Sequence, residues 1–299
     1  MEIDFIKYHG AGNDYIAIDG RGHELDWGNL SKDMSKPHFG IFSDGIVVVF
    51  DSDIADIKIR IFNPDGSEAE MSGNGVRLFS KFVLDNKICK VGLKGVLTVE
   101  TGGGVREVFP QFDIDNQMIS ARVAMGQPKF NRDDIPVSPT FFKENSPVFD
   151  YKISLGGHNI NISCVNIGNP HAVMITDKDV DSIDLLKIGP LVENNELFPN
   201  RINFEIVNII SRNSIKARIF ERGAGETLSS GTGTSACGIV CIKKGLVDEK
   251  VRVNVPGGFL DINWKIGEEA YLEGPTEKVF SGKWNIKEEN WNILRDLKL

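Results

Sequence analysis

The sequence predicts an α/β fold, of the α+β kind, with two pseudo-symmetric domains that each wrap a β-barrel-like sheet around a central helix. Residues 59–79 match the start of residues 217–239 without a gap, at an offset of 158 positions. Residues 12–18 match residues 168–174 at an offset of 156. Self-similarity at about half of the chain length indicates two copies of one structural unit.

The first copy has the pattern of a strand-rich shell around one helix. Residues 3–20 contain two β-like runs joined by a glycine turn, and residues 30–36 a short helix that Pro37 ends. Residues 45–51 form a buried strand. Apolar residues then recur at helical spacing over residues 76–86, which predicts the first central helix. Further β-like runs cover residues 96–101, 105–109 and 118–125.

The second copy follows a proline-containing loop at residues 127–147 and repeats this order. Helices are predicted at residues 183–194 and 234–244, the latter being the second central helix. The β-like runs cover residues 160–167, 206–210, 214–220, 251–255 and 258–264, and residues 160–175 repeat the opening stretch of the first copy. An amphipathic helix is expected at residues 284–299, docked on the protein's own surface.

These elements place the domain boundaries. The first domain is expected to comprise residues 1–126 and the C-terminal segment 276–299, and the second domain residues 127–275. The active-site cleft is expected between the two copies, because the polar turns of the repeat would face each other there.

Composition limits the range of functions. The chain has 299 residues, 41 % of them hydrophobic, which suits two soluble domains. Its net charge of −8 argues against nucleic acid or an anionic membrane as the main partner. No apolar run is long enough for a membrane span and the first ten residues lack the pattern of a signal peptide, so a cytoplasmic location is expected. The four cysteines lack metal-type spacing and are expected to be reduced thiols, so no metal site is predicted.

Each copy contains a Ser-Gly-x-Gly turn at the start of its central helix, beginning at Ser72 and at Ser230. A single turn of this kind indicates only a capped helix, because serine is a preferred N-cap and glycine permits unusual backbone angles. Two such turns that converge would offer unpaired N–H groups and two positive dipole ends, which suit a carboxylate or phosphate.

Two side chains placed on opposite sides of a bound carboxylate suit one reaction class. One group removes the α-proton and the other delivers a proton to the opposite face, while the N–H groups steady the charge that develops. That chemistry is racemisation or epimerisation without a cofactor.

Several segments between Lys7 and Pro275 resemble the diaminopimelate epimerases, a family of pyridoxal-independent amino-acid racemases and epimerases. They include KYHGAGNDYIAID, IFNPDGSEAEMSGNGVR, IGNPHAV and FERGAGETLSSGTGTSA, in the family's order. The resemblance implies a fold of two similar halves with the site between them. It also implies an isomerase that converts LL- to meso-diaminopimelate in the pathway to lysine and peptidoglycan, with no cofactor.

The resemblance also implies roles for individual residues. Backbone N–H groups of the two turns would bind the substrate α-carboxylate, at Gly73, Asn74, Gly231 and Thr232. Asparagines matching those that line the family's pocket are Asn13, Asn63, Asn169 and Asn203. Glu221 and Arg222 match a pair that helps to hold the amino and distal carboxylate groups, and His171 matches a histidine beside one catalytic group.

The two proton-transfer groups of the family are cysteines, and here both matching positions are serine, Ser72 and Ser230. A helix N-terminus can make a thiol a thiolate, but a hydroxyl starts several pKa units higher, and the dipole contributes only about 1–2 kcal/mol. Three interpretations remain open: an epimerase silenced by replacement of both cysteines, a diverged isomerase that uses Glu221, His171 or Asp65 as base, and a catalytically silent carboxylate-binding homologue.

Nucleotide binding through the glycine turns is a hypothesis of another class, but no turn carries the lysine of a P-loop. The expected partner is therefore a small amino-acid substrate. A homodimer is one assembly that the sequence allows.

Overall fold

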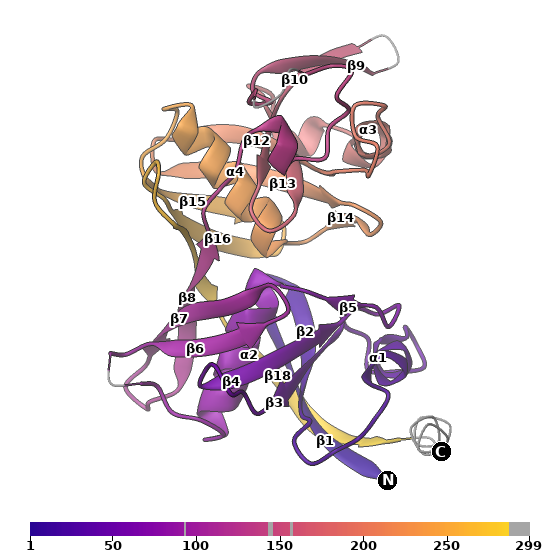
Figure 1. Cartoon of the computed structure of the whole chain (residues 1–299), viewed down its shortest axis with the longest axis vertical. Helices are drawn as coiled ribbons and strands as arrows, with labels where there is room; N and C mark the ends of the chain where they lie inside the picture. Colours follow the sequence, from indigo (N-terminus) through magenta and orange to yellow (C-terminus); the bar gives the residue numbers. More distant parts are fainter. Residues whose placement is uncertain (93, 143–145, 156–157, 287–299) are drawn as a thin grey trace. The chain divides into compact units, whose positions relative to one another are not determined.

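The computed structural model describes residues 1–92, 94–142, 146–155 and 158–286. The chain divides into two compact units, Met1–Val123 with Gly274–Leu299 (unit 1) and Ala124–Glu273 (unit 2) (Figure 1). The sequence placed these boundaries two or three residues later, after residues 126 and 275. Each unit is an α/β body in which strands surround a long helix, as the sequence predicts.

The described strands of unit 1 pair in the spatial order β18-β1-β2-β3-β4-β6-β7-β8, in which β2–β3 and β4–β6 are parallel pairs and the others antiparallel. The strands are β1 (Glu2–Gly10), β2 (Asn13–Asp19), β3 (Ile46–Phe50), β4 (Ile57–Phe62), β6 (Leu97–Thr101), β7 (Gly104–Phe112), β8 (Met118–Gly126) and β18 (Glu277–Asn285). The short β5 (Glu68–Ala69) pairs with β4, α2 (Gly73–Asp85) packs on β1 to β4 and β7, and α1 (Trp27–Ser35) completes the unit.

Unit 2 has the same topology, with the order β9-β10-β11-β12-β13-β15-β16-β17 and parallel pairs at β11–β12 and β13–β15. The strands are β9 (Tyr151–Leu155), β10 (His158–Asn166), β11 (Pro170–Ile175), β12 (Asn203–Ser211), β13 (Ser214–Glu221), β15 (Lys250–Val255), β16 (Gly258–Asn263) and β17 (Ala270–Pro275). β14 (Gly225–Thr227) pairs with β13, and α4 (Gly231–Lys243) is the central helix. The remaining helices are α3 (Leu185–Glu193) and the 3-10 turns η1 (Arg132–Asp134) and η2 (Val180–Ser182).

The repeat extends to strand register. Ala17 lies opposite Val47 in unit 1, and Val173 lies opposite Glu205 in unit 2. The offset of 156 relates Ala17 to Val173, and the offset of 158 relates Val47 to Glu205. Alternate residues on these strands face opposite sides of the sheet. One side packs under the short helices α1 and α3, so the other side faces the central helix.

The central helices explain why the strands close around them. Every residue of α4 from Gly231 to Ile242 is buried, and a helix that is apolar on all sides must lie inside a protein. Helix α2 is buried from Gly73 to Val83 and leaves only its C-terminal end partly exposed. Each unit therefore has its own core around its own helix.

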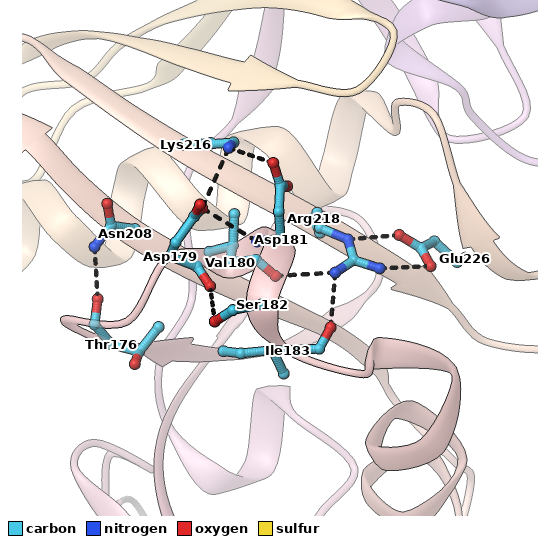
Figure 2. A network of polar contacts seen from close by, with 10 residues as sticks. All are labelled: Thr176, Asp179, Val180, Asp181, Ser182, Ile183, Asn208, Lys216, Arg218 and Glu226. Atoms are coloured by element: carbon cyan, nitrogen blue, oxygen red, sulfur yellow. Dashed lines mark hydrogen bonds and ion pairs between the residues drawn. The ribbon is translucent and has the colours of Figure 1, made fainter.

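A repeated arginine–carboxylate pair holds the short strand that leads to each serine turn. In unit 2, the Arg218 guanidinium donates to both carboxylate oxygens of Glu226, at 2.7 and 2.9 Å. Its third nitrogen donates to the carbonyls of Val180 and Ile183, as Figure 2 shows. In unit 1, Arg60 and Glu68 form the same bidentate pair at 2.8 and 2.7 Å. Bidentate geometry fixes orientation as well as contact, so β5 and β14 are held in register with their neighbours.

Two expectations need correction. Helix α1 begins at Trp27, three residues earlier than predicted, because Asp26 caps it by accepting a hydrogen bond from the Asn29 N–H. The terminal helix expected at residues 284–299 does not begin at Trp284, which lies in β18 paired with Ile3. The rest of that segment, from residue 287, lies outside the described residues. Among the described helices, none has the length and hydropathy required to cross a bilayer.

Close packing of α4 against β16 gives a test of this fold. A Cβ atom on Gly238 would lie 2.8 Å from Ile262 Cγ1 and 2.9 Å from its Cβ, so Gly238→Ala is expected to lower the free energy of unfolding by about 1–3 kcal/mol. The matching position in unit 1 is Ser80, whose Cβ already has room, so Ser80→Ala is expected to cost about 1 kcal/mol or less. Urea unfolding of both variants measures the difference, and equal stability of Gly238→Ala and the parent chain would contradict the packing described.

Candidate active site

The N-terminus of α2 is capped by Ser72, as the Ser-Gly-x-Gly pattern predicts. The Ser72 Oγ accepts a hydrogen bond from the Gly75 N–H at 3.0 Å and a second from the Tyr15 hydroxyl at 3.3 Å. Gly75 leaves space for the cap, because a Cβ there would lie 3.2 Å from the same oxygen. The first N–H groups of a helix have no partner within the helix, so those of Gly73 and Asn74 are offered to an acceptor.

A relay of amides runs from the interior of unit 1 to the same helix start. The buried Arg77 donates from Nη1 to Asn74 Oδ1 at 2.7 Å, and Asn74 Nδ2 donates to Asn13 Oδ1 at 3.0 Å. Asn13 Nδ2 donates in turn to Asp44 Oδ2 at 2.5 Å, and the Asp14 N–H reaches the same oxygen at 3.0 Å. Every donor in the relay points from the cation toward the carboxylate, so both amide oxygens are occupied internally.

Arg77 is an unusual buried cation. Its side chain is fully buried, and its Nε and Nη2 atoms have no hydrogen-bond partner in the part of the chain that the structure describes. Burial lowers the pKa of Arg77 to about 9, which still leaves the guanidinium charged at neutral pH. At the other end, burial raises the pKa of Asp44 above its ordinary value. A positive charge is thus held behind the start of α2, where an anion would also be attracted by the helix dipole.

Asn63 and Asp65 lie in the turn between β4 and β5. Asn63 Nδ2 donates to the Ser67 hydroxyl at 2.9 Å, and that hydroxyl donates to Asp65 Oδ1 at 2.6 Å. The Ser67 hydroxyl and N–H hold the pKa of the exposed Asp65 below its usual range. A carboxylate that is already well solvated and stabilised is a weak base, so the position of Asp65 does not favour it as a proton acceptor.

The N-terminus of α4 repeats the cap with different neighbours. Ser230 Oγ accepts from the Gly233 N–H at 3.3 Å and donates its own proton to Glu221 Oε2 at 2.9 Å. Ser230 is 5 % exposed, and Gly231 and Thr232 are also buried. The Thr232 hydroxyl lies 3.5 Å from Ser230 Oγ. The serine of unit 2 is therefore coupled to a carboxylate, whereas the serine of unit 1 is coupled to a phenol.

His171 lies at the position that Tyr15 occupies in unit 1, on the inner face of β11. Its Nδ1 is 2.6 Å from Glu205 Oε1, and its Nε2 is 2.8 Å from Asn169 Oδ1. His171 and Glu205 have no exposed side-chain surface. His171 is thus an internal link between a buried carboxylate and Asn169.

Asn203 and Arg222 have contrasting environments. Asn203 is buried, donates to the Pro170 carbonyl at 2.8 Å and accepts from the Arg222 N–H at 2.9 Å. Both of its polar atoms therefore hold loops of unit 2. Arg222 is exposed, and its guanidinium donates to the Asn200 carbonyl at 3.0 Å. Within the described residues no carboxylate pairs with Arg222, so the charge is available to an anion.

The structure thus gathers most of the predicted residues into two clusters, one in each unit. The unit 1 cluster contains Ser72, Gly73, Asn74 and Asn13, with Asn63 in the adjoining turn. The unit 2 cluster contains Ser230, Gly231, Thr232, Glu221, Arg222, Asn203, His171 and Asn169. In the parts of the chain that the structure describes, no group of three or more His, Cys, Asp or Glu side chains is placed to hold a metal ion.

The chain is thus a duplicated α/β barrel with a capped, polar helix start in each copy. The diaminopimelate epimerase family model matches residues 5–131 and 163–279. The chain belongs to the diaminopimelate epimerase family.

Relatives support the assignment over nearly the whole chain. A diaminopimelate epimerase from Methanococcus maripaludis strain S2 is 42 % identical over 287 residues, which cover 95 % of this chain and 100 % of the relative. One from Agathobacter rectalis is 42 % identical over 290 residues, with the same coverage of both chains.

Solved structures share the fold at low identity. A probable proline racemase from Agrobacterium radiobacter has a TM-score of 0.69 at 15 % identity, covering 95 % of this chain and 93 % of that one. A phenazine biosynthesis protein from Bacillus anthracis has a TM-score of 0.67 at 16 % identity, covering 96 % and 100 %. These similarities confirm the predicted fold class.

Four residues of the two clusters were missed by the sequence reasoning: Tyr15, Asp44, Arg77 and Glu205. Two of them left a signal in the sequence. Glu205 interrupts an apolar strand between Phe204 and Ile206, and Arg77 falls between Val76 and Leu78 in an apolar helix. A charged residue is rarely fully buried unless it is paired with another group, so a charge at such a position indicates a buried polar contact.

The environment of Arg77 predicts a stability contrast along α2. Arg77→Met removes a poorly paired buried charge but leaves Asn74 Oδ1 without its donor, so the free energy of unfolding is expected to change by no more than about 1 kcal/mol. Lys81→Met is expected to cost about 3 kcal/mol, because Lys81 pairs with Asp85 at 2.8 Å and also donates to the Met118 carbonyl. Thermal and urea unfolding compare the two, and a larger loss for Arg77→Met would contradict the proposed imbalance.

Proposed function

We propose that this chain inverts the α-carbon of diaminopimelate, converting the LL to the meso form without a cofactor. The observation that carries the proposal is the pair of equivalent helix N-termini, each with a hydroxyl at its cap. The names and about 40 % identity of the relatives support diaminopimelate as the substrate to test first.

In this proposal both helix starts act on one substrate. Its α-carboxylate accepts hydrogen bonds from the N–H groups at Gly73, Asn74, Gly231 and Thr232, a use that helix N-termini favour. Asn13 and Asn169 add side-chain donors, because their amide oxygens are already occupied. The exposed guanidinium of Arg222, with which no carboxylate of the described residues pairs, binds the distal carboxylate. Asn203 fixes the loop that carries Arg222.

The hydrogen bonds assign different tasks to the two serines. Ser72 Oγ accepts two hydrogen bonds and so keeps its own proton for the substrate. Ser230 Oγ donates a hydrogen bond to Glu221 Oε2, so a lone pair of Oγ can point toward the substrate Cα–H. We infer that Ser230 with Glu221 removes the α-proton and that Ser72 supplies the replacement on the other face.

Serine makes this reaction slow. A thiol has an ordinary pKa of about 8.5, and each pKa unit corresponds to about 1.4 kcal/mol. The hydroxyl lies several units higher, and a helix N-terminus recovers only about 1–2 kcal/mol of that difference. A carboxylate-binding homologue with very low turnover is therefore the second candidate function, and the Ser72 and Ser230 pair is the observation that favours it.

We further infer a cytoplasmic location. The cysteines Cys89, Cys164, Cys237 and Cys241 are free, as expected of a protein kept in a reducing compartment. Burial raises the pKa of the Cys164 thiol, with Glu205 as the second cause, so that thiol is no substitute for a catalytic cysteine at neutral pH.

Deuterium incorporation at Cα, followed by NMR in D₂O, tests the function. The chain as it stands is expected to exchange diaminopimelate slowly, and Ser72→Cys/Ser230→Cys at least about a hundredfold faster, since two or more pKa units separate the groups. Faster exchange by the serine chain of another amino acid would instead identify a diverged isomerase.

The single variants serve as matched controls. Ser230→Cys alone is expected to restore proton removal from one epimer, and Ser72→Cys alone from the other. If the double variant binds diaminopimelate but exchanges nothing, the epimerase proposal is wrong and the binding role remains. If neither chain binds diaminopimelate, both are wrong.

Arg222→Ala is expected to weaken binding of diaminopimelate about tenfold or more while leaving an amino acid with a single carboxylate nearly unaffected, because a charged hydrogen bond contributes about 1.5–3 kcal/mol. Calorimetric titration with diaminopimelate and with norleucine gives the comparison. Arg201→Ala is a suitable control, since that arginine is bound to Glu193. Equal losses for both ligands would exclude the role given to Arg222.

A further inference from the structure

Unit 2 contains a buried carboxylate that unit 1 lacks. Glu205 lies on β12 opposite Val173, and the corresponding residue of unit 1 is Val47, opposite Ala17. Both positions face the central helix of their unit, and Glu205 is fully buried there. Its Oε1 contacts His171, while its Oε2 has no hydrogen-bond partner among the described residues. Since the same fold closes around valine in unit 1, architecture alone does not require a carboxylate.

Several elements place titratable groups around Glu205. They are His171 on β11, Glu221 on β13, Cys164 on β10 and Cys237 on α4. Gly233 makes room for the carboxylate, because a Cβ there would lie 3.0 Å from Glu205 Oε1. Burial raises the pKa of Glu205, and His171 opposes that rise.

The hydrogen bonds of His171 fix how many protons the pair holds. The Asn169 amide oxygen can only accept, so the Nε2 that lies 2.8 Å from it carries a proton. The second nitrogen, Nδ1, is 2.6 Å from Glu205 Oε1, and two bare acceptors would repel at that distance. One proton must therefore lie between them, whichever atom holds it. The pair of His171 and Glu205 carries two protons and has no net charge.

We propose that Glu205 is a positioning residue that acts through His171 to hold the Asn169 amide with its oxygen inward and its NH₂ group available to a substrate carboxylate. This inference rests on the proposed function, which assigns Asn169 to the substrate. If the shared proton were lost, Nδ1–H would turn to Glu205, Nε2 would become an acceptor, and Asn169 would have to reverse. The site would then offer an oxygen where the substrate needs a donor.

Unit 1 achieves the same polarity by other means. Asn13 occupies the position of Asn169, and its oxygen accepts from Asn74, which Arg77 orients in turn. In unit 1 a buried cation fixes the orientation of the asparagine amide. In unit 2 a buried proton shared by two side chains fixes it. The agreement between two different solutions indicates that donor polarity at this position is what both units preserve.

The protonation of His171 can be measured directly by ¹⁵N NMR of the full chain labelled at its 5 histidines. His171→Asn assigns the signals. We expect Nε2 to carry a proton at neutral pH in the parent chain, whether or not ligand is present. A bare Nε2 would overturn the proposal. Because this readout needs no turnover, failure of the epimerase function would leave the test valid.

Variants at Glu205 complete the test, with meso-diaminopimelate as the calorimetric probe. Glu205→Val copies unit 1 and is expected to weaken binding about tenfold, the value of one oriented hydrogen bond, and to divide the single imidazole proton of His171 between Nδ1 and Nε2, because no side chain then supplies a proton to Nδ1. Glu205→Gln is expected to retain the affinity of the parent chain and the proton on Nε2, because its amide can donate to Nδ1. Identical behaviour of the two variants, or unchanged affinity in Glu205→Val, would overturn the proposal.

A double-mutant cycle separates positioning from simple packing. If Glu205 acts through Asn169, the losses in Glu205→Val and Asn169→Ala are expected to combine to clearly less than their sum. Additive losses in a folded double variant would contradict the link. Circular dichroism and thermal unfolding of each variant establish that the fold is retained.

Discussion

The unpaired N–H groups at the starts of α2 and α4 are the constraint on which the rest of the structure depends. Both helices are buried from their first residue, so these groups cannot be satisfied by bulk water alone. The serine cap satisfies the third N–H in each helix, and an anion is the natural partner for the others. The bidentate pairs at Arg60 and Arg218 then hold the strand that delivers each serine to its position.

The two copies preserve this framework and differ in the groups around it. Tyr15 and His171 occupy one repeated position, Val47 and Glu205 a second, and Asn63 and Glu221 a third. A histidine and two carboxylates therefore lie near the cap of unit 2, whereas the cap of unit 1 has a phenol, amides and the Arg77 guanidinium beside it and the Asp44 carboxylate at the far end of the amide relay. A reaction that handles the two faces of one carbon needs the same anchor on each side but not the same proton chemistry.

The sequence was sufficient for the fold because the repeat, the glycine turns and the apolar periodicity are local signals. It also located Ser72 and Ser230 as helix caps. It missed Tyr15, Arg77 and Glu205, since their importance arises from pairing between strands and from burial, which only the tertiary structure defines. The strand β18 was missed for the same reason: its residues are largely exposed, and pairing with β1 rather than a hydrophobic pattern determines it.

Substrate binding and proton transfer are separable in this molecule. The donors proposed to orient a carboxylate, at both helix starts and at Asn13 and Asn169, do not depend on the cap residue being a thiol. Proton transfer does, because the helix dipole supplies about 1–2 kcal/mol against a deficit of several pKa units. Glu221 offsets part of that deficit for Ser230, and Tyr15 offers no comparable base to Ser72. The two helix starts are thus alike in their backbone donors and unequal in the side chains beside them, and in the proposed reaction the slower proton removal is the step assigned to Ser72.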